Sequence, residues 1–174
     1  WGWINQEFLK KTNNNAQYSK LFRPKMPNSW LKEKRKWLTT TDIDSVMKQY
    51  EENIPEFKFI GAVPIDFDYE YNVGLCIVDE LCRLNIKKLY SKGIHKLGMV
   101  FNLDSHDEPG SHWVSLYSDF NLGEVYYFDS YGIYPPDEIR ILMERLRDQG
   151  RLLKGKPFNL YYNDIRHQFK NSEC

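Results

Sequence analysis

Apolar residues recur at helical spacing in three segments of the chain. The first segment follows the hydroxyl residues 39–41, which offer an N-terminal cap, the second covers 74–92, and the third opens at Pro135. Gly93 and Gly150 stand where the second and third helices are expected to end. The inward-facing positions are, in order, Ile43, Val46, Met47 and Tyr50; Leu75, Val78, Leu81, Cys82 and Leu89; and Ile139, Leu142, Met143 and Leu146.

Shorter apolar runs, bounded by turn residues, predict strands. The predicted strands cover residues 57–63, 97–103, 112–117, 124–129 and 158–162. A polar loop, 104–111, separates the second strand from the third, and a turn around Gly123 joins the third to the fourth. Helices mixed with adjacent strands predict an α+β fold, with a mixed sheet of four to five strands flanked by helices.

Composition limits the class of protein. Of the 174 residues, 41% are hydrophobic and 16% aromatic, which supplies a core for one domain and excludes general disorder. No apolar run approaches the roughly 18 residues that a membrane span needs. Three cysteines are too few for a disulfide scaffold and indicate a reducing compartment. Cys76 and Cys82 lie on the apolar pattern of the second helix, so we expect both to be buried small hydrophobes.

The formal net charge of zero conceals an asymmetry. Residues 1–36 hold nine basic and two acidic side chains, whereas residues 37–174 hold 15 basic and 22 acidic ones. We therefore divide the chain into a basic N-terminal arm, 1–36, parts of which lie against the body, and a body, 37–174. The basic run at 32–36 is either a solvated helix face or a contact for DNA or another acidic partner.

A histidine and an aspartate stand at the ends of two neighbouring predicted strands. His112 opens its strand directly after the polar loop, and Asp129 ends the next strand. If the two strands form a hairpin through Gly123, both side chains fall near the same end, where the carboxylate can orient the imidazole. The alternatives are an ordinary surface histidine and an aspartate that caps the turn 130–132.

The third cysteine differs from the other two. Cys174 follows a polar stretch rather than an apolar pattern, which favours a reactive thiol. A cysteine with a histidine elsewhere in the chain is the arrangement of thiol proteases. Gln168 supplies an amide donor suited to an oxyanion hole. The spacing of the histidines and cysteines supports no metal site, and no phosphate-binding glycine loop is present.

The ordered set of these residues resembles the ubiquitin-like-protein-specific cysteine proteases, which include the SUMO proteases and adenain. The matching motifs are Gly110-Ser-His112-Trp113, Val125-Tyr-Tyr-Phe-Asp129-Ser130 and Gln168-x5-Cys174. Two further segments, 59–67 and 100–106, look more like the versions in large DNA viruses. The resemblance covers residues 37–174 and implies the papain-like, adenain-like protease fold.

The resemblance also implies roles. Cys174 would be the nucleophile, His112 the group that takes the thiol proton and passes it to the leaving amine, and Asp129 the residue that orients His112. Gln168 would donate to the oxyanion together with the backbone amide of Cys174. We expect no cofactor, while the resemblance to adenain-like enzymes, which can use DNA as a cofactor, implies that a DNA contact would supplement the protease.

Two tryptophans complete the expected site. By resemblance, Trp113 and Trp37 would flank a narrow tunnel that admits small residues, typically glycine, before the cut. The alternative for each is an aromatic residue of the core. In the family the cysteine precedes a glycine and begins a buried helix, which lowers the thiol pKa. We expect that the parent protein continues with such a helix and that residues 1–174 alone are poorly active.

Three functions follow as hypotheses. The first is a thiol endopeptidase that cuts after glycine-containing motifs in a viral structural polyprotein or a ubiquitin-like protein. The second is an inactive module that binds a ubiquitin-like tail. The third is a nucleic-acid-binding accessory protein that uses residues 1–36. The expected location is intracellular, in cytoplasm or nucleus, and the virion if the protein is viral.

Overall fold

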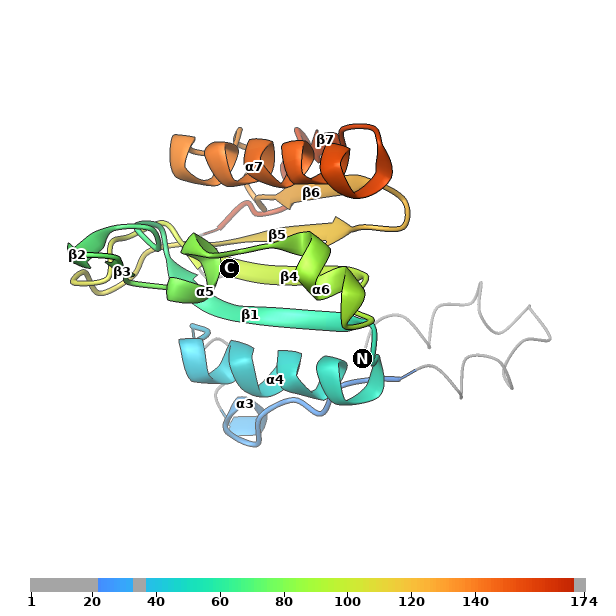
Figure 1. Ribbon diagram of the computed structural model, residues 1–174. Coiled ribbons are helices and arrows are strands. Elements are labelled where there is room, and N and C mark those ends of the chain that lie inside the picture. Colours follow the sequence, from blue (N-terminus) through green and yellow to red (C-terminus); the bar gives the residue numbers. More distant parts are fainter. Residues whose placement is uncertain (1–21, 33–36, 171–174) are drawn as a thin grey trace.

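A mixed five-stranded sheet forms the centre of the protein (Figure 1). The computed structural model describes residues 22–32 and 37–170. Strand order is β1-β4-β5-β6-β7, with β1/β4 and β6/β7 parallel and the two inner pairs antiparallel. The strands are β1 (Phe57–Pro64), β4 (Lys96–Asn102), β5 (Trp113–Asp119), β6 (Glu124–Phe128) and β7 (Asn159–Tyr162). The predicted α+β fold and its sheet are confirmed.

The hydrophobic core lies between one face of this sheet and the helices α5 (Asp79–Cys82), α6 (Ile86–Ser91) and α7 (Asp137–Lys154). Alternate residues of the three central strands are buried there, as period-two patterning requires. The core-facing strand residues are Leu97, Met99, Phe101, Val114, Leu116, Val125 and Tyr127, and the main helix residues opposite them are Leu81, Ile86, Ile139, Leu142 and Leu146. This packing fixes β5 and β6, whose ends carry His112 and Asp129.

Helix α4 (Thr40–Asn53) starts as predicted. Thr39 caps it by accepting from the Asp42 amide at 3.2 Å, and the Asp42 carboxylate accepts from the Thr39 amide at 3.1 Å. The helix packs on the edge strand β1, where Asp44 and Glu51 accept hydrogen bonds from outward-facing strand amides. The edge strand is thereby closed against further pairing.

Part of the basic arm lies against α4, as expected. The Phe22 ring meets the Tyr50 ring edge-on at 5.3 Å, and the Lys25 amide donates to Gln49 at 2.7 Å. A short helix, α3 (Ser29–Lys32), follows. Residues 1–21 and 33–36, which include most of the arm's basic side chains, lie outside the described residues, so the arm–body division and the DNA contact stay predictions.

Helix α7 (Asp137–Lys154) begins as predicted but does not end at Gly150. It continues for another turn to Gly155, whose φ of +75° provides the left-handed cap. Gly150 serves packing instead, because a Cβ there would lie 2.2 Å from the ring of Phe158. The apolar stripe of this helix is confirmed, since its inward residues are buried.

The single helix predicted over 74–92 is wrong. Gly74 adopts a φ of +72° and turns a small hairpin, and Asn85 starts a new helix by accepting from the Lys88 amide at 2.9 Å. The apolar spacing therefore belongs to several short elements. They are β2 (Glu70–Asn72), β3 (Leu75–Cys76), α5 (Asp79–Cys82) and α6 (Ile86–Ser91).

The expectation that Cys76 and Cys82 are buried small hydrophobes is also wrong. Both are half-buried rather than buried, and they form a disulfide bond across a Cα–Cα distance of 6.5 Å. The hairpin brings β3 beside α5, which a continuous helix could not do. The bond ties the hairpin to the body.

In the ranges 22–32 and 37–170, no helix has the length and apolar character that crossing a membrane requires.

Candidate active site

His112 and Asp129 meet at one end of the antiparallel pair β5/β6. His112 immediately precedes β5 and Asp129 immediately follows β6, and the pairing of Ser115 with Phe128 sets both at the same end. Nε2 of His112 lies 2.7 Å from Oδ1 of Asp129. Only 11% of the histidine side chain and 2% of the aspartate side chain are exposed. A carboxylate only accepts, so the Nε2 proton is held on this side of the ring.

Further hydrogen bonds hold Asp129 in place. Its Oδ1 accepts from the Tyr131 amide at 2.9 Å. The side chain of Asn163 brackets the Asp129 backbone, accepting from its amide at 2.8 Å and donating to its carbonyl at 2.7 Å. The Gly132 amide closes the turn on the same carbonyl at 2.9 Å. Asp129 thus caps the turn and binds His112, so the two interpretations of this residue are compatible. Buried charge is tolerated only with such partners.

Tyr131 connects the pair to Gln168. Its ring centroid lies 4.9 Å from that of His112, and its hydroxyl accepts from Nε2 of Gln168 at 3.1 Å. The Arg166 guanidinium lies over the Tyr131 ring, 5.4 Å from its centroid. Neither Tyr131 nor Asn163 was among the predicted site residues, because a tyrosine in a turn and an asparagine after a strand are common in ordinary loops.

Gln168 is buried and fully engaged with the protein. Its Oε1 accepts from the Ser130 hydroxyl at 2.6 Å, and its Nε2 donates to Tyr131 and to the Lys170 carbonyl at 3.0 Å. The backbone amide of Gln168 donates to the Ser130 carbonyl at 2.8 Å. The structure therefore brings Gln168 to the turn that follows Asp129. Cys174 lies outside the described residues.

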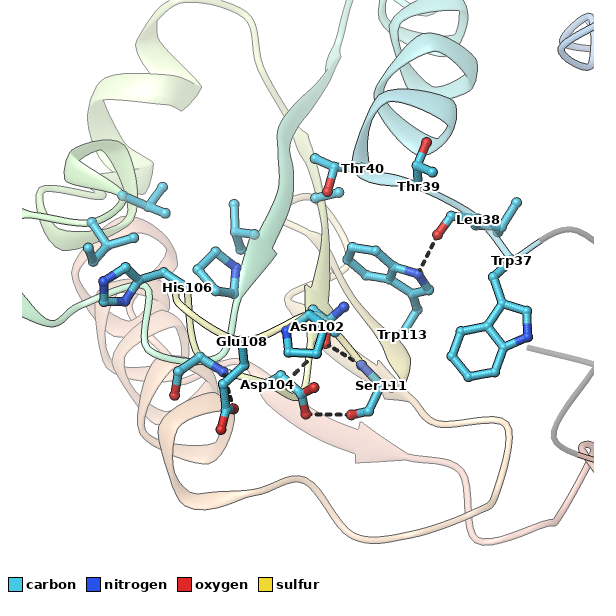
Figure 2. A pocket seen from close by; sticks show the side chains of 18 residues that line it. Trp37, Leu38, Thr39, Thr40, Asn102, Asp104, His106, Glu108, Ser111 and Trp113 are labelled. Atoms are coloured by element: carbon cyan, nitrogen blue, oxygen red, sulfur yellow. Dashed lines mark hydrogen bonds between the residues drawn. The ribbon is translucent and has the colours of Figure 1, made fainter. Parts of the chain in front are cut away.

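Trp113 and Trp37 line one cavity of about 660 Å³ (Figure 2). Nε1 of Trp113 donates to the Leu38 carbonyl at 3.0 Å, which joins β5 to the chain before α4. Trp113 is half-buried, and Trp37 is 54% exposed, so neither ring is a fully buried core residue. Leu38, next to Trp37, is 75 residues from Trp113 in sequence, and the hydrogen bond holds these two segments together.

The loop 104–111 forms another wall of the cavity and is fixed by its own hydrogen bonds. Oδ1 of Asn102 accepts from the amides of Asp104 and Ser111 at 3.0 and 3.1 Å, and the Ser111 hydroxyl donates to Asp104 at 2.5 Å (Figure 2). Gly110 has a φ of +92°, and a Cβ there would lie 2.5 Å from the Asn102 amide nitrogen. The loop thus leads into His112 with little freedom.

A second histidine–aspartate pair anchors this loop. Nδ1 of His106 lies 2.6 Å from Oδ2 of Asp66, whose Oδ1 accepts from the His106 amide at 2.9 Å. The ring of Tyr69 stacks on that of His106 with 6.1 Å between centroids. The pair was not predicted, because its members are 40 residues apart and belong to no shared motif.

Two groups around the site have shifted pKa values. The hydrogen bond to Asp66 raises the pKa of His106, against a smaller opposing effect of burial. Burial, with a further contribution from the charge of Asp129, raises the pKa of Tyr127, so its hydroxyl stays neutral near Asp129.

Comparison with known proteins gives viral relatives. No protein-family model matches the chain. Protein R355 of Acanthamoeba polyphaga mimivirus is named as a thiol protease. It is 39% identical to this chain over 138 residues, which are 79% of this chain and 44% of that protein. The cysteine protease S273R of African swine fever virus is 28% identical over 146 residues, 53% of its length. The chain spans about half the length of these relatives.

Solved structures share the fold. The pS273R protease of African swine fever virus superimposes with a TM-score of 0.67 at 20% identity, over 98% of this chain and 66% of that one. The protease domain of Ulp1, solved in complex with Smt3, the yeast orthologue of SUMO, gives a TM-score of 0.55 at 23% identity, over 80% of this chain and 61% of that one. The fold of the described residues is therefore that of known proteases.

Proposed function

This chain is a homologue of thiol proteases from large DNA viruses and has the fold of the SUMO proteases, and from that premise we propose that it is a cysteine peptidase. The observation that carries the proposal is the buried pair of His112 and Asp129, held next to Trp113 and joined through Ser130 to Gln168. Such a pair, buried and oriented, is what activation of a thiol requires.

We assign the proton transfer to His112. Because Asp129 holds the Nε2 proton, Nδ1 is the nitrogen that takes the proton from the thiol of Cys174. The thiolate then adds to the scissile carbonyl, His112 passes the proton to the leaving amine, and the C–N bond breaks to leave an acyl thioester. Water hydrolyses the thioester and restores the thiol, with His112 as the base in that step.

Gln168 is the proposed side-chain donor to the oxyanion, together with the backbone amide of Cys174. Both hydrogens of its Nε2 are used within the protein, one toward Tyr131 and one toward the Lys170 carbonyl. To serve the oxyanion, Gln168 has to exchange one of these bonds. The bond to the Lys170 backbone is the one we expect to be exchanged, because the Tyr131 hydroxyl belongs to the fixed group around His112.

We assign the site a preference for small residues before the cut, with Trp37 and Trp113 as the walls that exclude larger side chains. The hydrogen bond from Trp113 to the Leu38 carbonyl supports this, since it limits how far the two segments can separate. Two substrate classes fit, a viral structural polyprotein and a ubiquitin-like protein. The homologue S273R is named a SUMO-1 cysteine protease in some virus isolates, and Ulp1 was solved with Smt3.

Cleavage of matched peptides tests the function. The full-length protein is expected to cut a fluorogenic peptide after Gly-Gly and to cut its Leu-Leu counterpart at least about a hundredfold more slowly. The variant Cys174→Ala is expected to cut neither peptide. Absence of thiol-dependent cleavage would contradict a peptidase. Equal rates on the two peptides would contradict the tryptophan walls while leaving the peptidase intact.

The two substrate classes are separated by a second assay. A ubiquitin-like precursor and a viral structural polyprotein, each with a Gly-Gly site, are offered at equal concentration. We expect the polyprotein to be the better substrate, consistent with the viral relatives, and its processing to occur within the infected cell or the virion. A higher kcat/KM for the ubiquitin-like precursor would reverse this assignment.

A further inference from the structure

A small hairpin projects from the end of the molecule that carries the cavity. Its strands, β2 and β3, lie beside the loop 104–111 at one side of the sheet (Figure 1). The base of the hairpin is fixed, because the Ile77 amide donates to the Tyr69 carbonyl at 3.1 Å and the Val78 amide to the Phe67 carbonyl at 2.8 Å. The disulfide bond to α5 holds its second strand. The hairpin is therefore a fixed projection.

The hairpin presents large apolar side chains to solvent. Tyr71 is 60% exposed and Val73 is 97% exposed, and Tyr69 and Leu75 add further exposed surface next to them. Four exposed large side chains within seven residues are unusual for a segment that needs them only for folding. Neighbouring exposed apolar residues of this kind mark a contact surface.

Acidic side chains outnumber basic ones around the hairpin, although the Arg83 guanidinium donates to the Gly74 carbonyl at its turn, 3.0 Å away. The segments 59–82 and 97–111 hold eight acidic side chains and no lysine or arginine. They are Asp66, Asp68, Glu70, Asp79, Glu80, Asp104, Asp107 and Glu108. From outside these segments, Lys58 pairs with Glu80 and Arg83 with Asp79, so at least two of the eight are neutralised there. The acidic field is therefore strongest over β2 and the loop, and it attracts a basic partner and repels a nucleic acid.

The hairpin is continuous with the cavity. Ile77 and Val78, which follow β3, line the cavity together with His106, and Tyr69 stacks on His106. A polypeptide bound in the cavity would therefore have Ile77, Val78 and His106 as neighbours between the tryptophans and the hairpin.

We propose that the hairpin and the loop 104–111 form a docking surface for a basic segment with apolar side chains in the polypeptide substrate, at a distance from the bond that is cut. The apolar groups of the substrate contact Tyr71 and Val73, and its lysines or arginines lie against Glu70 and Glu108. That the bound polypeptide is a substrate rests on the proposed function, whereas the binding itself does not require cleavage.

Binding is tested first, with two fluorescein-labelled peptides of twelve residues. One alternates Lys with Leu and Phe, and the other has Glu in place of every Lys. We expect the basic peptide to bind and the acidic one not to, and the affinity to fall with added salt. The variant Tyr71→Ser/Val73→Ser is expected to bind about tenfold more weakly or worse. Leu152→Ser, which alters an 80% exposed leucine of α7, is the matched control and should bind like the wild type.

Charge gives an independent variant. Glu70→Lys should weaken the basic peptide severalfold, while Glu52→Lys, at an exposed position of α4, should not. Equal binding of both peptides, or no loss in either hairpin variant, would overturn the docking surface. These variants keep the core intact, and an unchanged circular dichroism spectrum confirms that the comparison is fair.

Kinetics then separate the two proposals. A Gly-Gly peptide is compared with the same peptide carrying the basic extension. Tyr71→Ser/Val73→Ser should raise KM for the extended peptide about tenfold and Glu70→Lys should raise it severalfold, while KM for the short peptide stays unchanged in both. Cleavage of the short peptide with no advantage for the extended one overturns the docking surface alone. Failure to cut either peptide contradicts the proposed function, while the binding data still decide the docking surface.

Discussion

One histidine–aspartate pair has its histidine within the loop 104–111 and the other has its histidine directly after that loop; their N···O distances are nearly equal, but their surroundings differ. His112 and Asp129 are 2.7 Å apart, and His106 and Asp66 are 2.6 Å apart. The first pair is almost completely buried, whereas 42% of the His106 side chain and 23% of the Asp66 side chain are exposed. The short distance alone does not tell a pair that does chemistry from one that anchors a loop.

The surroundings do tell them apart. Around the first pair, Tyr131 of the turn after Asp129 and Asn163 of a distant segment fix the carboxylate, and the Tyr131 ring packs on His112. Around the second, the neighbours are the stacked ring of Tyr69 and the His106 amide, which donates to Asp66. A buried ion pair has strong interactions and little screening, whereas an exposed one is weakened by solvent. We therefore assign proton transfer to the first pair and loop anchoring to the second.

The largest difference is expected when each histidine is removed. His112→Ala should lower kcat/KM on the Gly-Gly peptide at least about a thousandfold, because the thiol loses its base. His106→Ala should change it by less than about tenfold, since that ring holds only the loop. Steady-state kinetics measure both. Equal losses in the two variants would remove the distinction between the pairs.

Replacing the aspartates separates the pairs by stability. Asp129→Ala leaves the Tyr131 amide and the His112 ring without their acceptor inside the protein, so we expect a loss of about 3 kcal/mol in the free energy of unfolding. Asp66→Ala should cost clearly less, because water reaches its partner. Urea denaturation at neutral pH gives both values. A larger loss for Asp66→Ala would reverse the comparison.

Tyr131 offers a finer test of how the buried pair is supported. Tyr131→Phe keeps the ring against His112 but removes the acceptor for Gln168, so kcat should fall about tenfold with KM unchanged. Tyr131→Leu should also alter the pH profile of kcat/KM, because it removes the ring packing. Tyr134→Phe, a half-exposed tyrosine nearby in sequence, is the control. Identical kinetics for Tyr131→Phe and the wild type would show that the Gln168 contact is unimportant.

The exposed pair gives the smallest effect, and it depends on pH. The pKa of His106 is raised above its ordinary 6.5 by Asp66, so the folded state holds this proton more tightly than the unfolded chain. The pair's contribution to stability is therefore complete below pH 6.5 and is lost as pH rises through the raised pKa. An NMR titration of His106 should show the raised value and its return toward 6.5 in Asp66→Asn. A titration that Asp66→Asn leaves unchanged would contradict the assignment.

The sequence predicted the elements that rest on strong local signals. The N-terminal cap among residues 39–41 and the strands at 112–117 and 124–129 rest on local signals, and His112 and Asp129 stand at the ends of these two strands. Hydrophobic periodicity failed over 74–92, because short elements joined by Gly74 happened to repeat apolar residues at helical spacing.

Long-range contacts were beyond the sequence for a physical reason. Asn163 brackets Asp129 because β7 pairs with β6, and the ring of Phe158 lies against Gly150 of α7, where a Cβ would clash with it. Each depends on a residue brought near by the topology, and no spacing along the chain records it. The pair of Asp66 and His106, which joins β1's end to the loop, escaped prediction in the same way.

The most direct test is the reactivity of the proposed nucleophile. The rate at which iodoacetamide alkylates Cys174 is measured against pH by mass spectrometry, in the full-length protein and in its His112→Ala variant. The ordinary pKa of a thiol is about 8.5. We predict that Cys174 is alkylated rapidly well below this pH in the wild type, and that in His112→Ala the pH profile of alkylation shifts toward the ordinary thiol pKa. Superimposable profiles for the two proteins would contradict the claim that His112 activates Cys174.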